Sequence, residues 1–245
     1  MVWISRVAGM SALAMLAGGC DYVLGLQTFG PPADASGIDL GCAARPALLC
    51  ADFEEGTTFY SDRAANDIPL ATGNVTASVE PKDANSGNAL FVDSTGDTYR
   101  LEAVSTTPAT RITATFDLEL AHFDTTAPAT SLVVLYVEQP TAAECYVAMD
   151  YQPTPARLAL AENCNSQHAA DLGIALPSHT EFVSFTLTLD LVAKLATAQL
   201  GDTSATVHVD PVDGTTSPGV IFGFVDPLAG SSARVGFDNL VVVAE

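Results

Sequence analysis

The stretch Ala233-Arg-Val-Gly-Phe-Asp-Asn-Leu-Val-Val-Val-Ala-Glu245 ends the chain and decides its fold. Valines and a phenylalanine dominate it, and such residues favour β-strands. We expect this strand to pair with segment 48–54, Leu-Leu-Cys-Ala-Asp-Phe-Glu. The globular part of the chain would then begin and end at one place.

The two faces of this last strand follow from the alternation of strand side chains. Asp238 shares one face with Leu240 and Val242 in an unbroken strand. The opposite face is predicted to meet the core, and it carries Val235, Phe237, Val241 and Val243.

Several other segments also have strand character. Apolar and polar residues alternate along 113–120, 183–191 and 205–210, as in strands with one buried face. Segment 131–137 is apolar throughout, which favours the centre of a sheet, and 193–200 is expected to form a strand after a turn. With Gly- and Asn-rich turns at regular intervals, the sequence predicts an all-β, two-sheet antiparallel β-sandwich.

The N-terminal segment 1–19 has one early basic residue, Arg6, and then a short apolar run. This pattern is typical of a secretory signal peptide. The ending Leu16-Ala-Gly-Gly-Cys20 resembles a bacterial lipobox, with Ala17 where that family usually has Leu. The resemblance implies cleavage before Cys20, lipidation of its sulfur and anchoring in the bacterial cell envelope, on the periplasmic face or the cell surface.

Residues 20–41 show no periodicity and are rich in Gly and Pro, so we expect a flexible tether before a domain at 42–245. The chain has 29 acidic against 9 basic residues, a formal charge of −20. This balance excludes direct binding of nucleic acid, which needs Lys and Arg for phosphate contacts.

Four cysteines remain after Cys20, and an even number in an exported chain favours disulfides. Three pairings are open, of which we favour Cys42–Cys50 and Cys145–Cys164. A hairpin turn at 152–157 places Cys145 opposite Cys164, in the same register that buries the apolar residues of both strands.

Four motifs in chain order resemble the concanavalin A-like lectin/glucanase jelly rolls of the LamG-like branch. They are Asp52-Phe-Glu-Glu-Gly56, Ser86-Gly-Asn-Ala-Leu-Phe-Val92, Phe182-Val-Ser-Phe-Thr-Leu-Thr-Leu-Asp190 and Val235-Gly-Phe-Asp-Asn-Leu-Val-Val242. The first and last motifs also resemble galactose-binding-like jelly rolls, which are the alternative. Both families are β-sandwiches.

The resemblance implies a calcium site. In both families an Asp of the closing strand often helps to hold a structural Ca²⁺ near the first strand. Asp238 has that place here, and Asp52 and Glu54 are its expected neighbours. Carboxylate oxygens suit Ca²⁺, and calcium is the one cofactor that the sequence suggests.

Catalytic motifs are missing from the sequence. The Glu-x-Asp-x-x-Glu strand of glucanases has no counterpart, and the nearest acidic strand, Asp117-Leu-Glu119, is better explained as a solvated face. The histidines, which are His122, His168, His179 and His208, stand in unrelated contexts. For stacking on sugars the mature chain offers only tyrosines, of which the candidates are Tyr60, Tyr99 and Tyr136.

These observations favour a lipid-anchored envelope protein with a non-catalytic binding module, whose partner is a glycan or a protein. The alternative is a divergent polysaccharide hydrolase or lyase of the same fold.

Overall fold

The computed structural model describes residues 47–54, 70–71, 74–82, 87–124, 129–138, 144–153, 156–164, 167–175, 181–210, 217–225 and 231–245. The chain divides into two units, Met1–Asp39 and Leu40–Glu245, and every described residue belongs to the second. None of the described residues forms a helix with the length and hydrophobicity that crossing a membrane requires.

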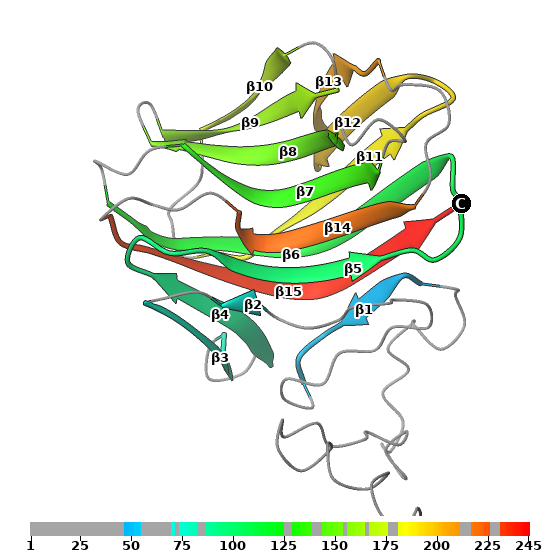
Figure 1. The fold of residues 1–245 in the computed structure, drawn as a ribbon. Coiled ribbons are helices and arrows are strands. Elements are labelled where there is room, and N and C mark those ends of the chain that lie inside the picture. The colour runs from blue at the N-terminus through cyan, green and yellow to red at the C-terminus, as the bar shows by residue number, and fades with distance from the viewer. Residues whose placement is uncertain are drawn as a thin grey trace, which may run out of the picture. The chain divides into compact units, whose positions relative to one another are not determined.

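The described strands form two antiparallel sheets, as predicted (Figure 1). Seven strands of the eight-stranded sheet follow one another in the order β13 (Thr203–His208), β12 (Leu195–Leu200), β11 (Val183–Asp190), β6 (Arg111–Phe123), β15 (Ala233–Ala244), β4 (Asn88–Ser94) and β3 (Val75–Pro81). The eighth strand, β1 (Leu49–Ala51), pairs with β15.

The seven-stranded sheet lies in front of the other in Figure 1, where β14 and β5 cross over β6 and β15. Its order is β10 (Gln167–Ala175), β9 (Ala156–Asn163), β8 (Glu144–Pro153), β7 (Thr130–Glu138), β14 (Pro218–Phe224), β5 (Tyr99–Val104) and β2 (Leu70–Ala71). The apolar segment 131–137 lies within β7, the fourth of the seven strands, so its predicted central place is confirmed.

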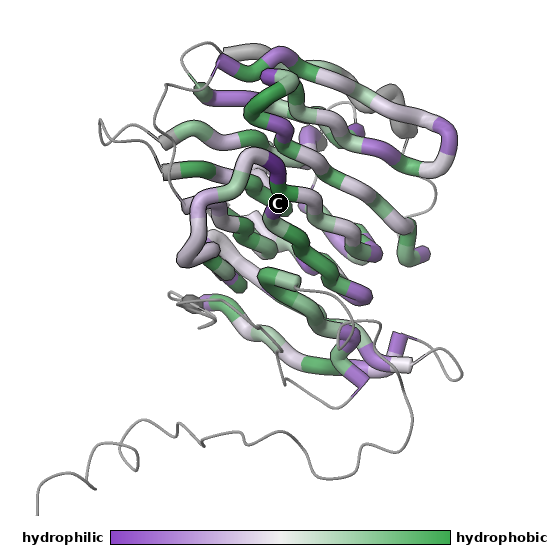
Figure 2. The backbone as a smooth tube through the Cα atoms, turned by 90° about the vertical axis from the view of Figure 1, so that its right-hand side faces the viewer, coloured by the Kyte–Doolittle hydropathy of each residue, from purple (hydrophilic) through white to green (hydrophobic). Residues whose placement is uncertain are grey.

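The alternation in the sequence becomes the division between core and surface. Hydrophobic and hydrophilic residues alternate along the strands (Figure 2). In β6 the buried side chains are those of Ile112, Ala114, Phe116, Leu118 and Leu120. Strands β11, β12 and β13 follow the same rule, which confirms the strands predicted at 183–191, 193–200 and 205–210.

A chain of aromatic rings joins the two sheets at the centre. Phe222 of β14 meets Phe116 of β6 edge-on at 5.5 Å between ring centroids, and Phe237 of β15 at 5.9 Å. Phe185 of β11 stacks on the other side of Phe116 at 5.8 Å. Edge-on and stacked pairs of this kind add to the stability that burial alone gives.

The closing strand β15 pairs with three other strands. On one edge it pairs with β6 over nearly its full length. On the other edge its first half pairs with β4, and its second half pairs with β1 through Leu240 to Val242. The predicted pairing of the first and last strands is therefore confirmed.

The predicted faces of β15 are right only for its first half. Val235 and Phe237 are buried in the core, but Leu240 and Val242 follow them there, while Val241 and Val243 are partly exposed. A β-bulge between Asp238 and Val241 explains the difference. Asn239 has a φ of 50°, a left-handed conformation that Asn tolerates, and the extra residue reverses the alternation.

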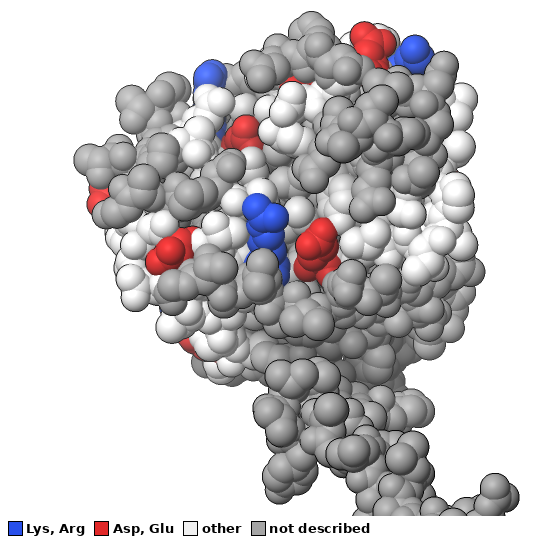
Figure 3. All heavy atoms as spheres, viewed as in Figure 1, with Lys and Arg blue, Asp and Glu red and all other residues white. Residues whose placement is uncertain are grey.

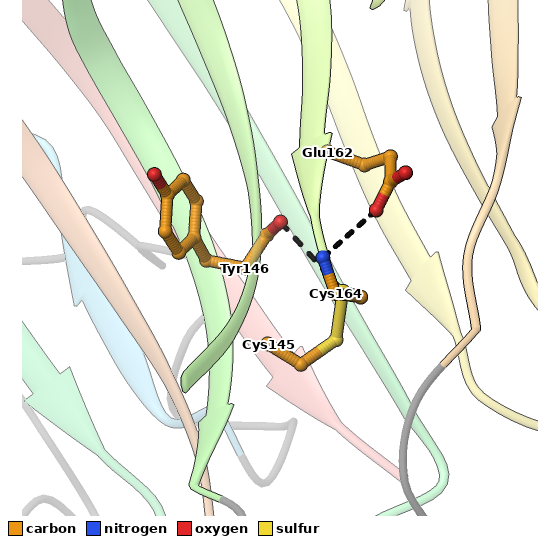
Figure 4. Close-up of a disulfide and its surroundings, with 4 residues drawn as sticks. All are labelled: Cys145, Tyr146, Glu162 and Cys164. Atoms are coloured by element: carbon orange, nitrogen blue, oxygen red, sulfur yellow. Dashed lines mark hydrogen bonds between the residues drawn. A yellow bond between two sulfur atoms is a disulfide. The ribbon is translucent and has the colours of Figure 1, made fainter. Parts of the chain in front are cut away.

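The hairpin of β8 and β9 has the predicted register. Gln152 pairs with Arg157, and Met149 pairs with Leu160. Cys145 and Cys164 form the predicted disulfide, with their Cα atoms 4.2 Å apart (Figure 4). The carboxylate of buried Glu162 accepts a hydrogen bond from the Cys164 backbone N–H at 2.9 Å.

Cys50 is buried in β1 and is also disulfide-bonded. Its predicted partner, Cys42, lies outside the described residues, so the Cys42–Cys50 pairing stays a prediction.

The bulge predicts a sharp contrast between neighbouring residues of β15. Leu240→Ala should lower the free energy of unfolding by about 2–5 kcal/mol, because it leaves a cavity in the core. Val241→Ala should lower it by less than about 1 kcal/mol, because Val241 faces outward. Urea denaturation of both variants measures the difference. A larger loss of unfolding free energy for Val241→Ala than for Leu240→Ala would contradict the bulge and support an unbroken strand.

The disulfide links residues 19 positions apart. Replacing both Cys145 and Cys164 with Ser should lower the free energy of unfolding by about 3 kcal/mol, because the unfolded chain gains the conformational freedom that the disulfide removes. Urea denaturation under oxidising conditions tests this. Peptide mapping without reductant supplies the check, since a bond from either residue to Cys50 would contradict the pairing.

Candidate functional site

The candidate site lies on the outer face of the seven-stranded sheet, where two tyrosines stand side by side. Tyr136 of β7 pairs with Tyr146 of β8 across the sheet. Both side chains point away from the core, because their neighbours Leu135 and Val147 point into it. Both rings remain partly exposed.

The ring of Tyr136 lies directly over Gly219 of β14. A Cβ built on Gly219 would stand 2.3 Å from Cζ of this ring, so only glycine leaves room for it. Beyond Gly219, the Tyr136 hydroxyl donates a hydrogen bond to Oε1 of Glu102 on β5. The ring therefore spans β14 and is fixed at its far end.

Beside the tyrosines on the same outer face is a small apolar cluster of Val134, Ala148 and Ile221, against which both rings pack. These three residues occupy one row across β8, β7 and β14, since Val134 pairs with both Ala148 and Ile221. We name Tyr136, Tyr146 and this cluster the tyrosine platform. Its support is apolar and closely packed, so the rings have little freedom to move.

Polar groups flank the tyrosine platform. On β5, Arg100 shares the outer face with Glu102, and its Nη2 donates to the Val225 carbonyl at 3.4 Å. On β8, Asp150 accepts a hydrogen bond from the Ser131 hydroxyl at 2.7 Å. Figure 3 views the molecule from this side and shows a basic residue with an acidic residue beside it near the middle of the face.

Two carboxylates of this face, those of Asp150 and Glu102, are too far apart to act together in glycoside hydrolysis. Asp150 on β8 and Glu102 on β5 are separated by β7 and β14. Three strand spacings amount to about 14 Å, whereas the paired carboxylates of glycosidases lie about 5–9.5 Å apart. Asp150 and Glu102 therefore do not form a paired acid and nucleophile, and the described side chains of this face offer stacking and hydrogen bonding.

Of the tyrosines predicted to contact sugars, only Tyr136 reaches the surface described here. Tyr99 points into the core, where burial raises its pKa to about 12, and it was therefore a wrong candidate. Tyr60 lies outside the described residues.

The sequence analysis missed Tyr146, Arg100 and Glu102, although the signals were present. Tyr146 follows Cys145 in the predicted hairpin, and an inward Cys requires an outward Tyr. Segment 99–104 alternates as clearly as the other strands, with Arg100 and Glu102 on its polar side.

The predicted calcium ligands do not form a metal-binding group in the described part of the chain. The Asp52 carboxylate accepts from the Glu54 backbone N–H at 3.3 Å, and the Glu54 carboxylate accepts from the Asn88 backbone N–H at 3.0 Å. Asp238 pairs instead with the Lys82 ammonium. No group of three or more His, Cys, Asp or Glu that could hold a metal occurs among the described residues.

The acidic pair of β6 lies on the outer face of the eight-stranded sheet. Asp117 accepts hydrogen bonds from Ser184 and Asn239. Partial burial raises the pKa of Glu119, and the nearby Arg234 lowers it. These contacts agree with the interpretation of this strand as a polar surface.

The histidines that can be placed are also on surfaces. His122 lies within 3.3 Å of the Ser232 hydroxyl, and His208 lies 3.1 Å from the Asp210 carboxylate. The His168 side chain and all of His179 lie outside the described residues.

Neither protein-family models nor curated proteins match this sequence. Solved structures do match the fold. The cellulose induced protein Cip1 is 15% identical with a TM-score of 0.54, over 80% of this chain and 97% of Cip1. The family 7 alginate lyase A1-II′ is 10% identical with a TM-score of 0.52, over 80% of this chain and 94% of the lyase.

Botulinum neurotoxin type C, whose cell entry depends on interaction with two ganglioside molecules, is 10% identical with a TM-score of 0.55. The match covers 82% of this chain and 48% of the neurotoxin chain, and the chain spans only 19% of a similar sialidase. At these identities the similarity shows the fold alone. The chain is a jelly-roll β-sandwich, the fold class that it shares with these solved structures.

Proposed function

We propose that this protein is a lipid-anchored protein of the bacterial cell envelope whose β-sandwich binds a glycan, without chemistry, on the tyrosine platform. The observation that carries the proposal is the fixed ring of Tyr136, which lies over Gly219 and is bonded to Glu102. An aromatic ring held flat on a sheet presents an apolar surface beside polar groups, as ligand sites commonly do.

An uncharged glycan suits this face better than a polyanionic one. The chain carries a formal charge of −20, so a uronic acid polymer approaches against net repulsion. Arg157, a cation of the same sheet, already donates to Gln152 at 2.7 Å. The hydroxyl groups of a neutral sugar can hydrogen-bond to the Glu102 and Arg100 side chains of β5, while its apolar C–H face stacks on the Tyr136 and Tyr146 rings.

The alternative is a divergent polysaccharide hydrolase or lyase, which fits the alginate lyases among the similar folds. The separation of Glu102 from Asp150 opposes a hydrolase that uses these two residues as acid and nucleophile. A lyase would release unsaturated sugars, which absorb ultraviolet light, so the same samples used for binding can be assayed for that product.

Binding to an array of neutral and uronic acid oligosaccharides tests the site. We expect binding to neutral glycans, and about a tenfold loss of affinity in Tyr136→Ala, equivalent to about 1.4 kcal/mol of aromatic contact. Gly219→Ala should give a similar loss, because its Cβ displaces the ring. Thr197→Ala, on the outer face of the other sheet, is the matched control and should bind as the unaltered protein does.

If all four proteins bind a glycan with equal affinity, the glycan does not bind on the tyrosine platform. If none of them binds any glycan, the proposed function is wrong. A preference for uronic acid polymers would contradict the proposal of a neutral ligand. Release of unsaturated sugars would show that the protein is a lyase and not only a binding protein.

The anchor has a separate test, because Cys20 lies outside the described residues. Cys20→Ser should move the protein from the membrane fraction to the soluble fraction, since the acyl chains provide the attachment. Mass spectrometry of the unaltered protein should find the acyl groups on Cys20. A membrane-bound Cys20→Ser protein, together with an unmodified Cys20, would contradict the lipobox interpretation.

A further inference from the structure

A buried carboxyl group stands next to the bulge of β15. Asp238 lies just before Asn239, the residue with positive φ. In the strand register it stands opposite Asp117 of β6. Its side chain is only 1% exposed, and its Oδ1 has no hydrogen-bond partner. Burial raises the pKa of this carboxyl, while the bond from Lys82 lowers it. A buried carboxylate of this kind needs a cation nearby.

Lys82 provides that cation from a distant part of the chain. It follows β3, where its backbone N–H donates to the Gly87 carbonyl at 2.9 Å. Its ammonium makes an ion pair and a hydrogen bond with Oδ2 of Asp238, and the Lys82 side chain is only 16% exposed. Since 156 residues separate the two, this contact ties the β3 end of the sheet to its closing strand.

An aromatic ring covers the ammonium. Nζ of Lys82 lies 5.5 Å from the centroid of Phe182, a distance at which the ring attracts a cation. The edge of Phe182 passes over Gly236, where an added Cβ would stand 2.8 Å from Cζ, and meets Phe91 at 6.0 Å. The ammonium therefore lies between a carboxylate and a ring, largely out of water.

A calcium ion does not fit beside this arrangement. Ca²⁺ requires six to eight oxygen ligands, and Asp52 and Glu54 are not assembled with Asp238 into a ligand group among the described residues. A divalent ion at the Asp238 carboxylate would also lie within a few ångströms of the Lys82 ammonium, where like charges repel strongly.

We propose that the Lys82 ammonium takes the place of calcium at Asp238, so that the sandwich is stabilised by a cation of its own chain and its stability does not depend on calcium. This role is independent of the glycan site, which lies on the other sheet.

The experiment compares melting temperatures in excess calcium and in chelator. For the unaltered protein we expect the same melting temperature in both, within about 1 °C. Lys82→Met should melt about 6–12 °C lower, as expected when one partner of a buried ion pair is removed from a domain of about 200 residues. Lys194→Met is the control, because Lys194 is 53% exposed and its ion pair with the exposed Asp210 is long, at 3.9 Å. The melting temperature of this variant should barely change, since exposed ion pairs contribute little to stability.

The double variant Lys82→Met/Asp238→Asn separates charge from packing. It should recover more than half of the loss, because no unpaired charge remains. The proposal is wrong if calcium raises the melting temperature of the unaltered protein above the value measured in chelator. It is also wrong if Lys82→Met melts no lower than Lys194→Met. The calcium comparison needs no variant, so it decides the matter even if Lys82→Met does not fold.

Discussion

The closing strand β15 is the constraint on which the rest of this sandwich depends. It is a neighbour of β6 on one side and of both β4 and β1 on the other. Each of those strands can pair only if β15 keeps its inward side chains in register with the opposite sheet. The bulge at Asn239 keeps apolar side chains directed at the core along the whole of β15, because it lets Phe237, Leu240 and Val242 all reach the core.

A buried charge stands beside this bulge. Water cannot solvate the carboxylate of Asp238, which is only 1% exposed, so the sheet must supply a counter-charge. Lys82 reaches it from the end of β3, and Phe182 closes over the ammonium. This ion pair therefore joins segments far apart in the chain, next to the bulge that lets Leu240 and Val242 reach the core.

The seven-stranded sheet uses glycine in a different way. Gly219 is required because a side chain there would occupy the space of the Tyr136 ring. The missing side chain turns an ordinary outward tyrosine into a fixed surface that reaches from β7 to Glu102 on β5. Such rigidity favours binding, since little side-chain freedom is lost when a ligand lands on the ring.

The sequence by itself determined the fold class, about half of the strands and the register of the β8–β9 hairpin. Alternation with period two encodes which side chains are buried, and the apolar pairs of the hairpin fit only one register, which also aligns Cys145 with Cys164. The pairing of the first and last strands followed from the same pattern.

Only the tertiary structure decided the faces of the second half of β15, the partner of Asp238 and the composition of the tyrosine platform. One extra residue reverses every later side chain, and alternation alone cannot locate that residue. Lys82 and Glu102 find their partners through strand order, and strand order depends on packing between the whole sheets rather than on any local pattern of residues.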